Sequence, residues 1–429
     1  MKKYESYKDS GVGWIGEIPS HWSCIKIKHL LRERVDKSED GIGEPLSMSQ
    51  KYGLIPTSQM DVVPNLATSY VGAKRTRQGD MVLNKLKAHL GVFALSAYDG
   101  LVSPDYAVYY GTGRADLEYL EYLFKTPLYV SEFIKKTTGV AIGFNRLYTD
   151  DLFSIPAHYP PMQEQKRIVD YLKDKTLKIE RYVSARERER ELFDSLKQSE
   201  IANVVTKGLN PNVRMKDSGI PWIGMIPEHW ETRTLSQMAR VHFISNKNVH
   251  HQNLLSLSYG KIVCKDINTT EGLLPASFDN YQIVEDGNIV LRLTDLQNDH
   301  KSLRVGLSTQ EGIITSAYLA IEAFTGILPK YLYFLFHSID VKKVFYSMGN
   351  GLRQSLNWTE LRKLKCIVPP ILEQQAIVDY IEAKLSKIDS CMADLQTEID
   401  YLKEFKQRLI SDVVTGQICV AEPQKGEQQ

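Results

Sequence analysis

Basic and amide side chains gather in residues 72–91 of this chain, GAKRTRQGDMVLNKLKAHLG, where Asp80 is the only acidic residue. Lysine and arginine neutralise phosphates, while asparagine and arginine can pair with the edges of bases. Apolar and polar residues near 82–87 are spaced so that such side chains would follow a strand and its exit loop. We therefore predict a nucleic-acid contact, with an ordinary solvated hairpin as the alternative. The candidate residues are Lys74, Arg75 and Arg77 for phosphates and Asn84, Lys85 and Lys87 for bases, together with His89.

The second half of the chain has a counterpart of this stretch at residues 292–304, RLTDLQNDHKSLR. It is less positive, yet it is rich in side chains that can hydrogen-bond to base edges. We predict that it contacts a second segment of nucleic acid. Its candidate residues are Arg292, Thr294, Asp295, Gln297, Asn298 and Lys301, and Arg304 closes the stretch.

A third pair of candidate segments precedes two Pro-Pro dipeptides, in GFNRLYTDDLFSIPAHYPP (143–161) and LRQSLNWTELRKLKCIVPP (352–370). Each has the pattern of a short helix, and Thr149 and Thr359 resemble N-caps, because a threonine oxygen can accept a hydrogen bond from an unpaired backbone N–H. Polar residues at the front of these helices could contact phosphate or base, or could cap and pack. They are Asn145, Arg146, Arg353 and Gln354.

No catalytic motif accompanies these residues. The sequence has no Gly-rich phosphate loop of the G-x-x-x-x-G-K-[ST] type, no Asn/Asp-Pro-Pro-aromatic tetrapeptide of an amino-methyltransferase and no H-x-x-x-H metal pair. His250 and His251 are adjacent and would point to different faces of the chain. The sequence thus predicts a binding protein that is not itself an enzyme and that holds no metal or cofactor.

Two motifs occur twice and organise the chain around these candidates. KDSGVGWIGEIPSHW (8–22) returns as KDSGIPWIGMIPEHW (216–230), with 11 of 15 positions identical. PPMQEQKRIVDYLKDKTLKIE (160–180) returns as PPILEQQAIVDYIEAKLSKID (369–389), with 11 of 21 identical, and VVT at 204–206 returns at 413–415. The stretches between the motifs diverge, which predicts one common frame that presents two different surfaces.

We predict an α+β fold in which two mixed domains alternate with two long helices as a pseudo-two-fold repeat. Strand patterns at 80–86, 106–110, 287–293 and 317–323, and helical patterns at 115–136 and 328–347, indicate the mixed domains. The predicted boundaries are a first mixed domain at 1–159, a first long helix at 160–207, a second mixed domain at 208–368, a second long helix at 369–417 and a flexible C-terminal tail at 418–429.

Each long helix has a narrow apolar stripe. No Pro or Gly lies between the Pro-Pro dipeptides and Gly208 or Gly416, which leaves about 45 residues, or roughly 65 Å of helix. Residues recur at alternating steps of four and three, the heptad spacing of a coiled coil. We predict that the helices pair in antiparallel orientation, with packing of each helix on its own domain as the alternative. The predicted seam is Ile168, Leu172, Ile179, Tyr182, Phe193 and Leu196 in the first helix, and Ile377, Ile381, Ile388, Leu395, Leu402, Phe405 and Leu409 in the second.

Tryptophans recur at the same places in both copies of the first motif, as Trp14 and Trp22 and as Trp222 and Trp230. Exposed aromatic rings can stack on unpaired bases. These tryptophans are identical in the two copies, whereas the candidate contact surfaces differ. They therefore belong to the common frame, and we predict that they anchor the motif to its domain.

Composition limits the class of protein. The chain has 429 residues, a net charge of +1 and 43% hydrophobic residues, enough for more than one buried core. Its five cysteines are scattered, with no C-x-x-C pair, which fits a reducing compartment. The first residues lack the apolar region of a signal peptide, and no run approaches the ~18 apolar residues of a membrane span. We expect a cytoplasmic protein with no membrane partner.

The layout resembles that of the specificity subunit of type I restriction–modification systems. The resemblance rests on the duplicated KDSG-x-x-WIG-x-IP-x-HW motif, the duplicated PP-x-x-EQ-x-x-IV-x-Y helix start and the divergent blocks between them, and it covers nearly the whole chain. It implies that 1–159 and 208–368 are target recognition domains, each for one half of a split double-stranded DNA sequence. It also implies a coiled coil that sets their spacing and binds two modification subunits.

The same resemblance assigns the chemistry to partner subunits. Methyltransferase subunits would bring S-adenosylmethionine, and two restriction subunits, where present, would bring ATP with Mg²⁺ for translocation and cleavage. The chain departs from longer members of the family at its short connector, TKGLNPNVRMKDSG (206–219), which holds no tandem tetrapeptide repeat. The alternative function is a coiled-coil scaffold with two protein-binding heads and no DNA role. That alternative fits the neutral net charge but does not explain why the heads diverged within a constant frame.

Overall fold

The computed structural model describes residues 2–49, 52–60, 69–138, 146–249, 251–267, 277–296, 302–348 and 355–420. The chain forms two compact units, of which the first comprises Met1–Arg186 and Thr397–Gln429 and the second comprises Glu187–Gln396. Each unit therefore contains part of both long helices, whereas the boundaries predicted from the sequence separate helices from domains. Both units mix helices with strands, which confirms the predicted α+β class.

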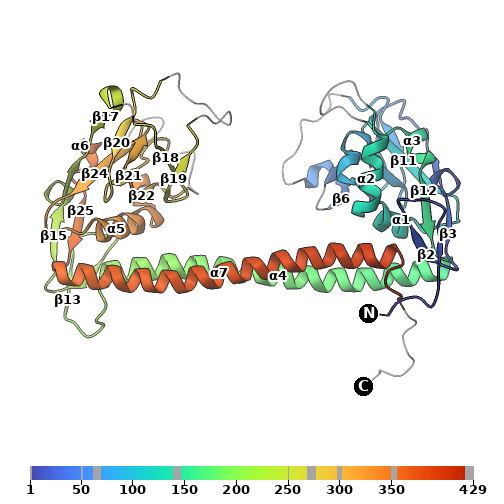
Figure 1. Cartoon of the computed structure of the whole chain (residues 1–429). Coiled ribbons are helices and arrows are strands. Elements are labelled where there is room, and N and C mark those ends of the chain that lie inside the picture. Colours follow the sequence, from blue (N-terminus) through green and yellow to red (C-terminus); the bar gives the residue numbers. More distant parts are fainter. Residues whose placement is uncertain are drawn as a thin grey trace. The chain divides into compact units, whose positions relative to one another are not determined.

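The first unit is built on a four-stranded antiparallel sheet with the strand order β4-β11-β8-β9. Figure 1 labels β11 of this sheet. Tyr106 at the start of β11 lies opposite Asn84 at the end of β8, so the exit loop of β8 begins beside β11. The sheet strands are β4 (Leu31–Glu33), β8 (Met81–Asn84), β9 (Phe93–Leu95) and β11 (Tyr106–Gly111). The paired strands around it are β1 (Tyr7–Asp9) with β2 (Glu17–Pro19), β3 (Ser23–Lys26) with β12 (Pro156–Tyr159), β5 (Leu46–Ser49) with β6 (Gly53–Pro56), and β7 (Lys74–Thr76) with β10 (Gly100–Val102).

The second unit repeats this sheet with the strand order β16-β24-β21-β22, so that β21 takes the place of β8. It adds a five-stranded sheet, β17-β20-β23-β18-β19, where the first unit has only strand pairs. The repeated sheet comprises β16 (Ala239–Val241), β21 (Ile289–Leu291), β22 (Val305–Leu307) and β24 (Leu319–Ala323). The other strands are β13 (Met215–Asp217), β14 (Met225–Pro227), β15 (Glu231–Thr234), β17 (Ile244–Ser245), β18 (Leu254–Ser258), β19 (Lys261–Lys265), β20 (Gln282–Val284), β23 (Gly312–Ile314) and β25 (Lys365–Val368).

The predicted strands at 80–86, 106–110, 287–293 and 317–323 are confirmed as β8, β11, β21 and β24. The helical pattern at 115–136 forms two helices instead of one, because the side chain of Thr126 caps the second and Pro127 occupies its first turn. The pattern at 328–347 is interrupted at Lys343, whose φ is 58°. The short helices are α1 (Leu117–Phe124), α2 (Pro127–Lys136), α3 (Thr149–Ser154), α5 (Pro329–Val341) and α6 (Trp358–Leu361), with the 3-10 turns η1 (Ile27–His29), η2 (Thr57–Gln59), η3 (Lys85–Leu90), η4 (Leu235–Gln237), η5 (Asn246–Asn248) and η6 (Val344–Ser347).

The predicted caps of the two short helices before the Pro-Pro dipeptides are wrong. Helix α3 begins at Thr149 itself, whose hydroxyl lies 3.1 Å from that of Tyr109. In α6 the cap is Asn357, which accepts hydrogen bonds from the backbone N–H groups of Thr359 and Glu360. Asparagine is at least as good an N-cap as threonine, and here it lies one residue before the first helical turn.

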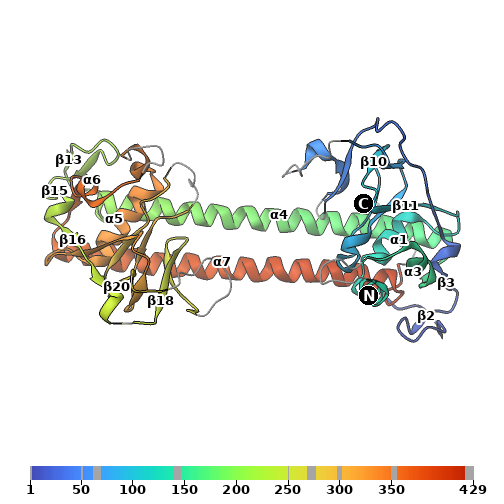
Figure 2. The same cartoon turned by 90° about the horizontal axis from the view of Figure 1, so that it is seen from above.

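The two long helices α4 (Met162–Lys207) and α7 (Ile371–Val414) lie side by side within each unit, as Figures 1 and 2 show. Side-chain contacts at 2.6 to 3.1 Å join a rising residue number on α4 to a falling one on α7, so the pairing is antiparallel in both units, as predicted. The pairs are Glu180 with Lys406 and Arg186 with Glu398 in the first unit, and Lys197 with Asp389 and Glu200 with Tyr380 in the second.

Part of the predicted seam is wrong, and the error has the same form in both helices. Tyr182, Leu196 and Phe405 are 46%, 45% and 45% exposed. In α4 the next residue is less exposed in each case: Val183, after Tyr182, is buried, and Lys197, after Leu196, is partly buried. In α7, Ile399 is buried although the prediction omits it. The remaining predicted seam residues are buried or partly buried, and they are Ile168, Leu172, Ile179, Phe193, Ile377, Ile381, Ile388, Leu395, Leu402 and Leu409.

In a heptad, one seam position recurs every seven residues, as Ile381, Ile388 and Leu395 do in α7, and a second seam position lies three or four residues after it. For α4 the prediction used a spacing of three residues, which selects the apolar side chains of Tyr182 and Leu196. The structure uses a spacing of four residues, which selects Lys197, and Lys197 forms an ion pair with Asp389 of α7 at 2.7 Å. Charged residues that make cross-helix pairs can thus occupy seam positions, and apolarity alone selects the wrong phase.

The duplicated motifs bind one another inside each unit. In the first unit, Glu164 accepts hydrogen bonds from Tyr4 at 2.7 Å and Trp22 at 3.2 Å, and lies 2.7 Å from Nε2 of His21. The glutamate of the PP-x-x-EQ motif therefore fixes the His-Trp pair of the other motif to the start of α4. Glu373 does the same in the second unit, at 2.8 Å from His229 and 3.0 Å from Trp230.

The glutamine of the PP-x-x-EQ motif has an equally defined role. The amide nitrogen of Gln165 donates to the carbonyl of Pro160 at 2.7 Å, and its oxygen accepts from the backbone N–H of Asp116 at 2.7 Å. In the second unit Gln374 donates to Pro369 at 2.9 Å and accepts from the N–H of Leu328 at 2.9 Å. Each glutamine thus joins the start of a long helix to the segment before α1 or α5.

The Val-Val-Thr ends of the long helices dock on tyrosines of the units. The hydroxyl of Tyr119 donates to the carbonyl of Val414 at 2.9 Å, and that of Tyr331 donates to Val205 at 3.4 Å. Gly416 follows with φ of +79°, and a Cβ there would lie 2.5 Å from Pro19. Glycine is therefore required both by the left-handed turn that ends the helix and by the close approach of the first motif.

The tryptophan prediction is confirmed. Trp22 and Trp230 are 0% exposed and belong to the two main cores. Trp14 packs edge-on against Tyr129 with ring centroids 5.1 Å apart, and Trp222 packs against the second core. These four rings hold the frame together, so stacking on bases is excluded for the two that are fully buried.

Candidate nucleic-acid interface

The first unit brings two of the predicted contact segments together where β8 ends. Lys85 begins the 3-10 turn η3, and its carbonyl accepts a hydrogen bond from the N–H of Leu147 at 3.2 Å. Next to Leu147, the guanidinium of Arg146 lies 3.1 Å from Asp105. The fold thus places residues 84–87 beside the segment that precedes α3, although about 60 residues separate them in the chain.

Lys85 is partly buried among charges of both signs. Burial lowers the pKa of its ammonium, and the neighbouring Lys74 and Arg146 act in the same direction, while Glu33 and Asp105 oppose them. A phosphate beside Lys85 would offset this effect, because an adjacent anion favours the charged form. The predicted anion-binding character of this stretch is consistent with the arrangement.

The predicted phosphate contacts differ in their availability. Lys74 is 8% exposed and its Nζ lies 3.5 Å from Glu33, and Arg75 lies 3.0 Å from Asp40. Arg77 and Lys87 are exposed, and no ion pair of either is seen among the described ranges. Of the three predicted phosphate contacts, Arg77 can therefore meet an external phosphate without exchanging an ion-pair partner, and Lys87, predicted for a base edge, is exposed in the same way.

The single acid of the stretch has a structural role. Asp80 is 3% exposed and accepts two hydrogen bonds from Arg34, at 2.7 and 2.9 Å, and one from the N–H of Arg77 at 2.9 Å. The turn between β7 and β8 is therefore fixed by a carboxylate that solvent does not reach. The backbone from which the Arg77 side chain extends is therefore held in place by Asp80.

Asn84 has a partner in the fold as well. Its side-chain oxygen accepts a hydrogen bond from the N–H of Leu86 at 3.2 Å and caps η3, and the residue is 8% exposed. The side chain of His89 and all of Asn145 lie outside the described residues. Their base or phosphate contacts, like those of the other candidates, stay predictions.

The second unit repeats the arrangement with different side chains. The N–H of Leu356 donates to the carbonyl of Leu293 at 2.9 Å, which joins the exit loop of β21 to the segment before α6. Leu293 and Leu296 are buried, whereas Arg292, Thr294 and Asp295 are partly exposed. The other predicted contacts of this unit fall outside the described residues, namely Gln297, Asn298, Lys301, Arg353 and Gln354.

Arg304 requires a correction. The sequence groups it with side chains that could contact bases, but in the structure it is 0% exposed and its guanidinium bonds to backbone carbonyls of the 292–295 loop. Neither this role nor that of Arg34 is indicated by the sequence. The only available signal is the place of Arg304 directly before β22, opposite Arg292 in the hairpin.

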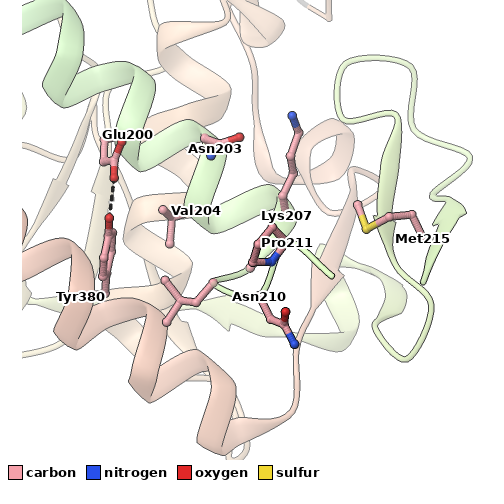
Figure 3. Close-up of a pocket in the computed structure, with 10 residues that line it drawn as sticks. Glu200, Asn203, Val204, Lys207, Asn210, Pro211, Met215 and Tyr380 are labelled. Atoms are coloured by element: carbon pink, nitrogen blue, oxygen red, sulfur yellow. Dashed lines mark hydrogen bonds between the residues drawn. The ribbon is translucent and has the colours of Figure 1, made fainter. Parts of the chain in front are cut away.

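A concave site of about 650 Å³ lies in the second unit where α4 ends (Figure 3). Tyr380 donates a hydrogen bond to Glu200 across it at 2.7 Å, and this bond raises the pKa of Tyr380. A phenol with a raised pKa stays protonated and is a poor base or nucleophile. Tyr380 is therefore not an activated group at this site.

Two further searches apply to the described part of the chain. Within those ranges, no three or more His, Cys, Asp or Glu side chains are grouped so that they could hold a metal ion. None of the helices seen there combines the length and apolar character that crossing a bilayer requires.

The chain is similar to known proteins along almost its whole length, although no family model matches it. It is 21% identical over 97% of its residues and 98% of the relative to a predicted type I restriction enzyme MjaX specificity subunit of Methanocaldococcus jannaschii. It is 24% identical, over 70% of both chains, to the type I restriction enzyme MjaVIII specificity subunit of the same organism.

A solved chain has the same fold. It comes from work on the structural basis of complex assembly and conformational transition of the type I R-M system, and it matches with a TM-score of 0.66 at 13% identity, over 94% of this chain and 99% of that one. The resemblance predicted from the duplicated motifs is confirmed: this chain is a relative of type I restriction enzyme specificity subunits.

Proposed function

We propose that this chain is the DNA sequence-specificity subunit of a type I restriction–modification complex, and that each unit recognises one half of a bipartite double-stranded target. The observation that carries the proposal is the repeated placement of unlike loops. The exit loops of β8 and β21 lie at equivalent positions of the two repeated four-stranded sheets, and each is joined to the segment before a short helix. One frame thus offers two different sets of polar side chains.

The first loop is suited to phosphate and base contacts together. Arg77 and Lys87 are exposed and would approach the DNA backbone and base edges directly. Lys74 and Arg75 would exchange Glu33 and Asp40 for phosphate oxygens. Lys85 would gain a phosphate in addition to the carboxylates of Glu33 and Asp105, and this anion would favour its charged form.

The second loop would rely more on hydrogen bonds than on charge. Arg292 can pair bidentately with guanine, the hydroxyl of Thr294 can donate or accept at base edges, and the carboxylate of Asp295 can accept from an amino group. Their partly exposed side chains alternate with buried leucines, which fixes the direction in which they point.

The chain itself would not catalyse. Two modification subunits would dock on the long helices and bring S-adenosylmethionine, and two restriction subunits, where present, would bring ATP with Mg²⁺. The paired helices would also set the distance between the half-sites. Insertion of seven residues into α4 would then change the accepted gap or abolish binding, and an unchanged gap with intact binding would contradict this part of the proposal.

Methylome sequencing of the source strain with and without this chain tests the function. We expect a split, adenine-methylated motif that disappears on deletion and returns when the full chain is supplied again. A methylome that does not change on deletion, in a strain where the chain is expressed, would overturn the DNA role and leave the protein-binding scaffold.

A further inference from the structure

An arginine with no access to solvent lies beneath the loop of the second unit. Arg304 is 0% exposed, and its guanidinium donates hydrogen bonds to the carbonyls of Thr294 at 2.8 Å, Asp295 at 3.2 Å and Arg292 at 3.3 Å. These three carbonyls belong to the loop that follows β21. One side chain therefore holds the loop backbone at three points.

The same arginine is held from its other side. Its Nε donates to the hydroxyl of Tyr346 at 3.1 Å, and its backbone N–H donates to Asp340 at 2.5 Å. Asp340 is 0% exposed and lies in α5, the helix that packs against β22. Arg304 thus connects the loop to the buried core of the unit.

The chemistry of this contact requires arginine. Carbonyl groups at the end of a strand need partners, and a buried cation is tolerated only when hydrogen bonds replace its water. The planar guanidinium presents several donors in a fixed fork, whereas a lysine ammonium is a compact charge that cannot match three separated carbonyls. Asp295, one of the bonded residues, has φ of 55°, a left-handed conformation that few residues adopt without support.

We propose that Arg304 is a positioning residue for DNA sequence recognition by the second unit. It fixes the backbone of residues 292–295 so that Arg292 and Thr294 meet one half-site in a single geometry. The inference rests on the proposed function. A loop held less firmly would still carry the same side chains, but it would accept more than one base, because discrimination depends on hydrogen-bond geometry.

The test replaces the codon in the source strain and sequences the methylome. For Arg304→Lys we expect the preference for the correct base to fall about tenfold at one or two positions of one half-site, the size of a weakened base contact. The other half-site serves as the internal reference and keeps its preference. Tyr346→Phe, which removes one acceptor and keeps the ring, should give a smaller loss, roughly two- to threefold, at the same positions.

A matched control lies at the opposite edge of the same sheet. Arg240 of β16 forms an exposed ion pair with Glu322, so Arg240→Lys should leave the motif unchanged. The abundance of each variant chain is measured in parallel, and Tyr346→Phe carries the test if Arg304→Lys does not accumulate.

Three results are distinguishable. Relaxation confined to one half-site supports the inference. An unchanged motif, or uniformly weaker methylation with both half-sites still intact, overturns it, because a purely structural loss lowers the amount of active complex and not its choice of bases. A strain in which the unaltered chain determines no motif contradicts the proposed function instead.

Discussion

The two units use one frame but support their loops in different ways. In both, a glutamate at the start of a long helix binds the His-Trp pair of the first motif, through Glu164 in one and Glu373 in the other. The side chains that support the loops differ between the two units. Asp80 fixes the β7–β8 turn of the first unit from below, whereas Arg304 fixes the exit loop of the second.

This difference separates the frame from its contact surfaces. Where two copies have the same residues, they make the same hydrogen bonds, as the glutamates and glutamines of the PP-x-x-EQ motif do. Where the copies diverge, the supports differ in charge and place: Asp80 accepts from the N–H of Arg77 in the turn before β8, and Arg304 donates to three carbonyls in the loop after β21. A carboxylate suits the first and a guanidinium suits the second.

The largest effect is expected when the shared anchor is removed. Trp22→Ala and Trp230→Ala should each destabilise their own unit by about 3–5 kcal/mol, because both rings are fully buried and leave a cavity. Peptide-resolved hydrogen exchange would locate the loss in one unit. Trp14→Ala, at a partly buried ring of the same motif, is the control and should cost less. Equal protection in all three variants would contradict the anchoring role.

A pH-dependent effect should follow from one buried histidine in each unit. Burial lowers the pKa of His158 and of His337 to about 4. As the pH falls below the ordinary histidine value, the unfolded chain takes up the proton first. Stability is therefore fully present above about pH 6.5 and is lost between there and about pH 4, by up to ~3 kcal/mol for each site.

Urea denaturation at pH 7.5 and 4.5 measures this slope, which His158→Gln and His337→Gln should each reduce, with His29→Gln at an exposed position as the control. The two sites should differ at pH 7.5. His158 contacts Tyr129 and Val414 through its two ring nitrogens, whereas Nδ1 of His337 has no partner among the described residues. Replacement by leucine should therefore cost more at His158, and an equal cost would contradict this difference.

A smaller difference is expected between the two glutamates. Glu164 has three partners in Tyr4, His21 and Trp22 and is 8% exposed, whereas Glu373 contacts His229 and Trp230 and is 26% exposed. Glu164→Gln should lower the free energy of unfolding by about 2 kcal/mol and Glu373→Gln by about 1 kcal/mol, since hydrogen bonds to a buried charge are worth more. Thermal unfolding followed for each unit measures both, and a reversed order would show that exposure does not decide the effect.

The smallest effect compares two arginines of one stretch. Arg77 is exposed, while Arg75 is paired with Asp40 at 3.0 Å. Arg77→Ala should weaken binding to all DNA sequences alike and reduce the salt slope of log K by about 1, whereas Arg75→Ala should reduce it by less, because its charge is already partly neutralised. Titrations of the assembled complex at several salt concentrations measure both slopes. Equal slopes for the two variants would mean that the ion pair is broken on binding.

Much of the frame could be predicted because its signals are local or repeated. The heptad-spaced runs without Pro or Gly predicted α4 and α7 to within two residues at their starts, and β-rich runs predicted β8, β11, β21 and β24. The duplicated motifs predicted that the tryptophans belong to the frame. These features can be seen in the sequence because the direction of a side chain in a helix or strand depends only on the place of its residue along that element.

The candidate contact segments could be predicted less completely. The structure brings the selected segments next to each other, through Lys85 and Leu147 in the first unit and Leu293 and Leu356 in the second, while their contacts with nucleic acid stay predictions. It did not distinguish exposed Arg77 from largely buried Lys74, and it grouped buried Arg304 with side chains that are predicted to contact bases. A cation looks the same in the sequence whether it meets solvent, a carboxylate or a carbonyl.

The sequence by itself determined the two-fold repetition, the long helices and the motifs that recur at equivalent places in the two halves. The tertiary structure alone decided which face of each helix is buried, which acids neutralise which bases and where an arginine becomes part of the core. The reason is that repetition and periodicity are properties of the chain, whereas burial and charge pairing depend on what lies opposite a side chain, often more than 100 residues away, as between Glu164 and Trp22.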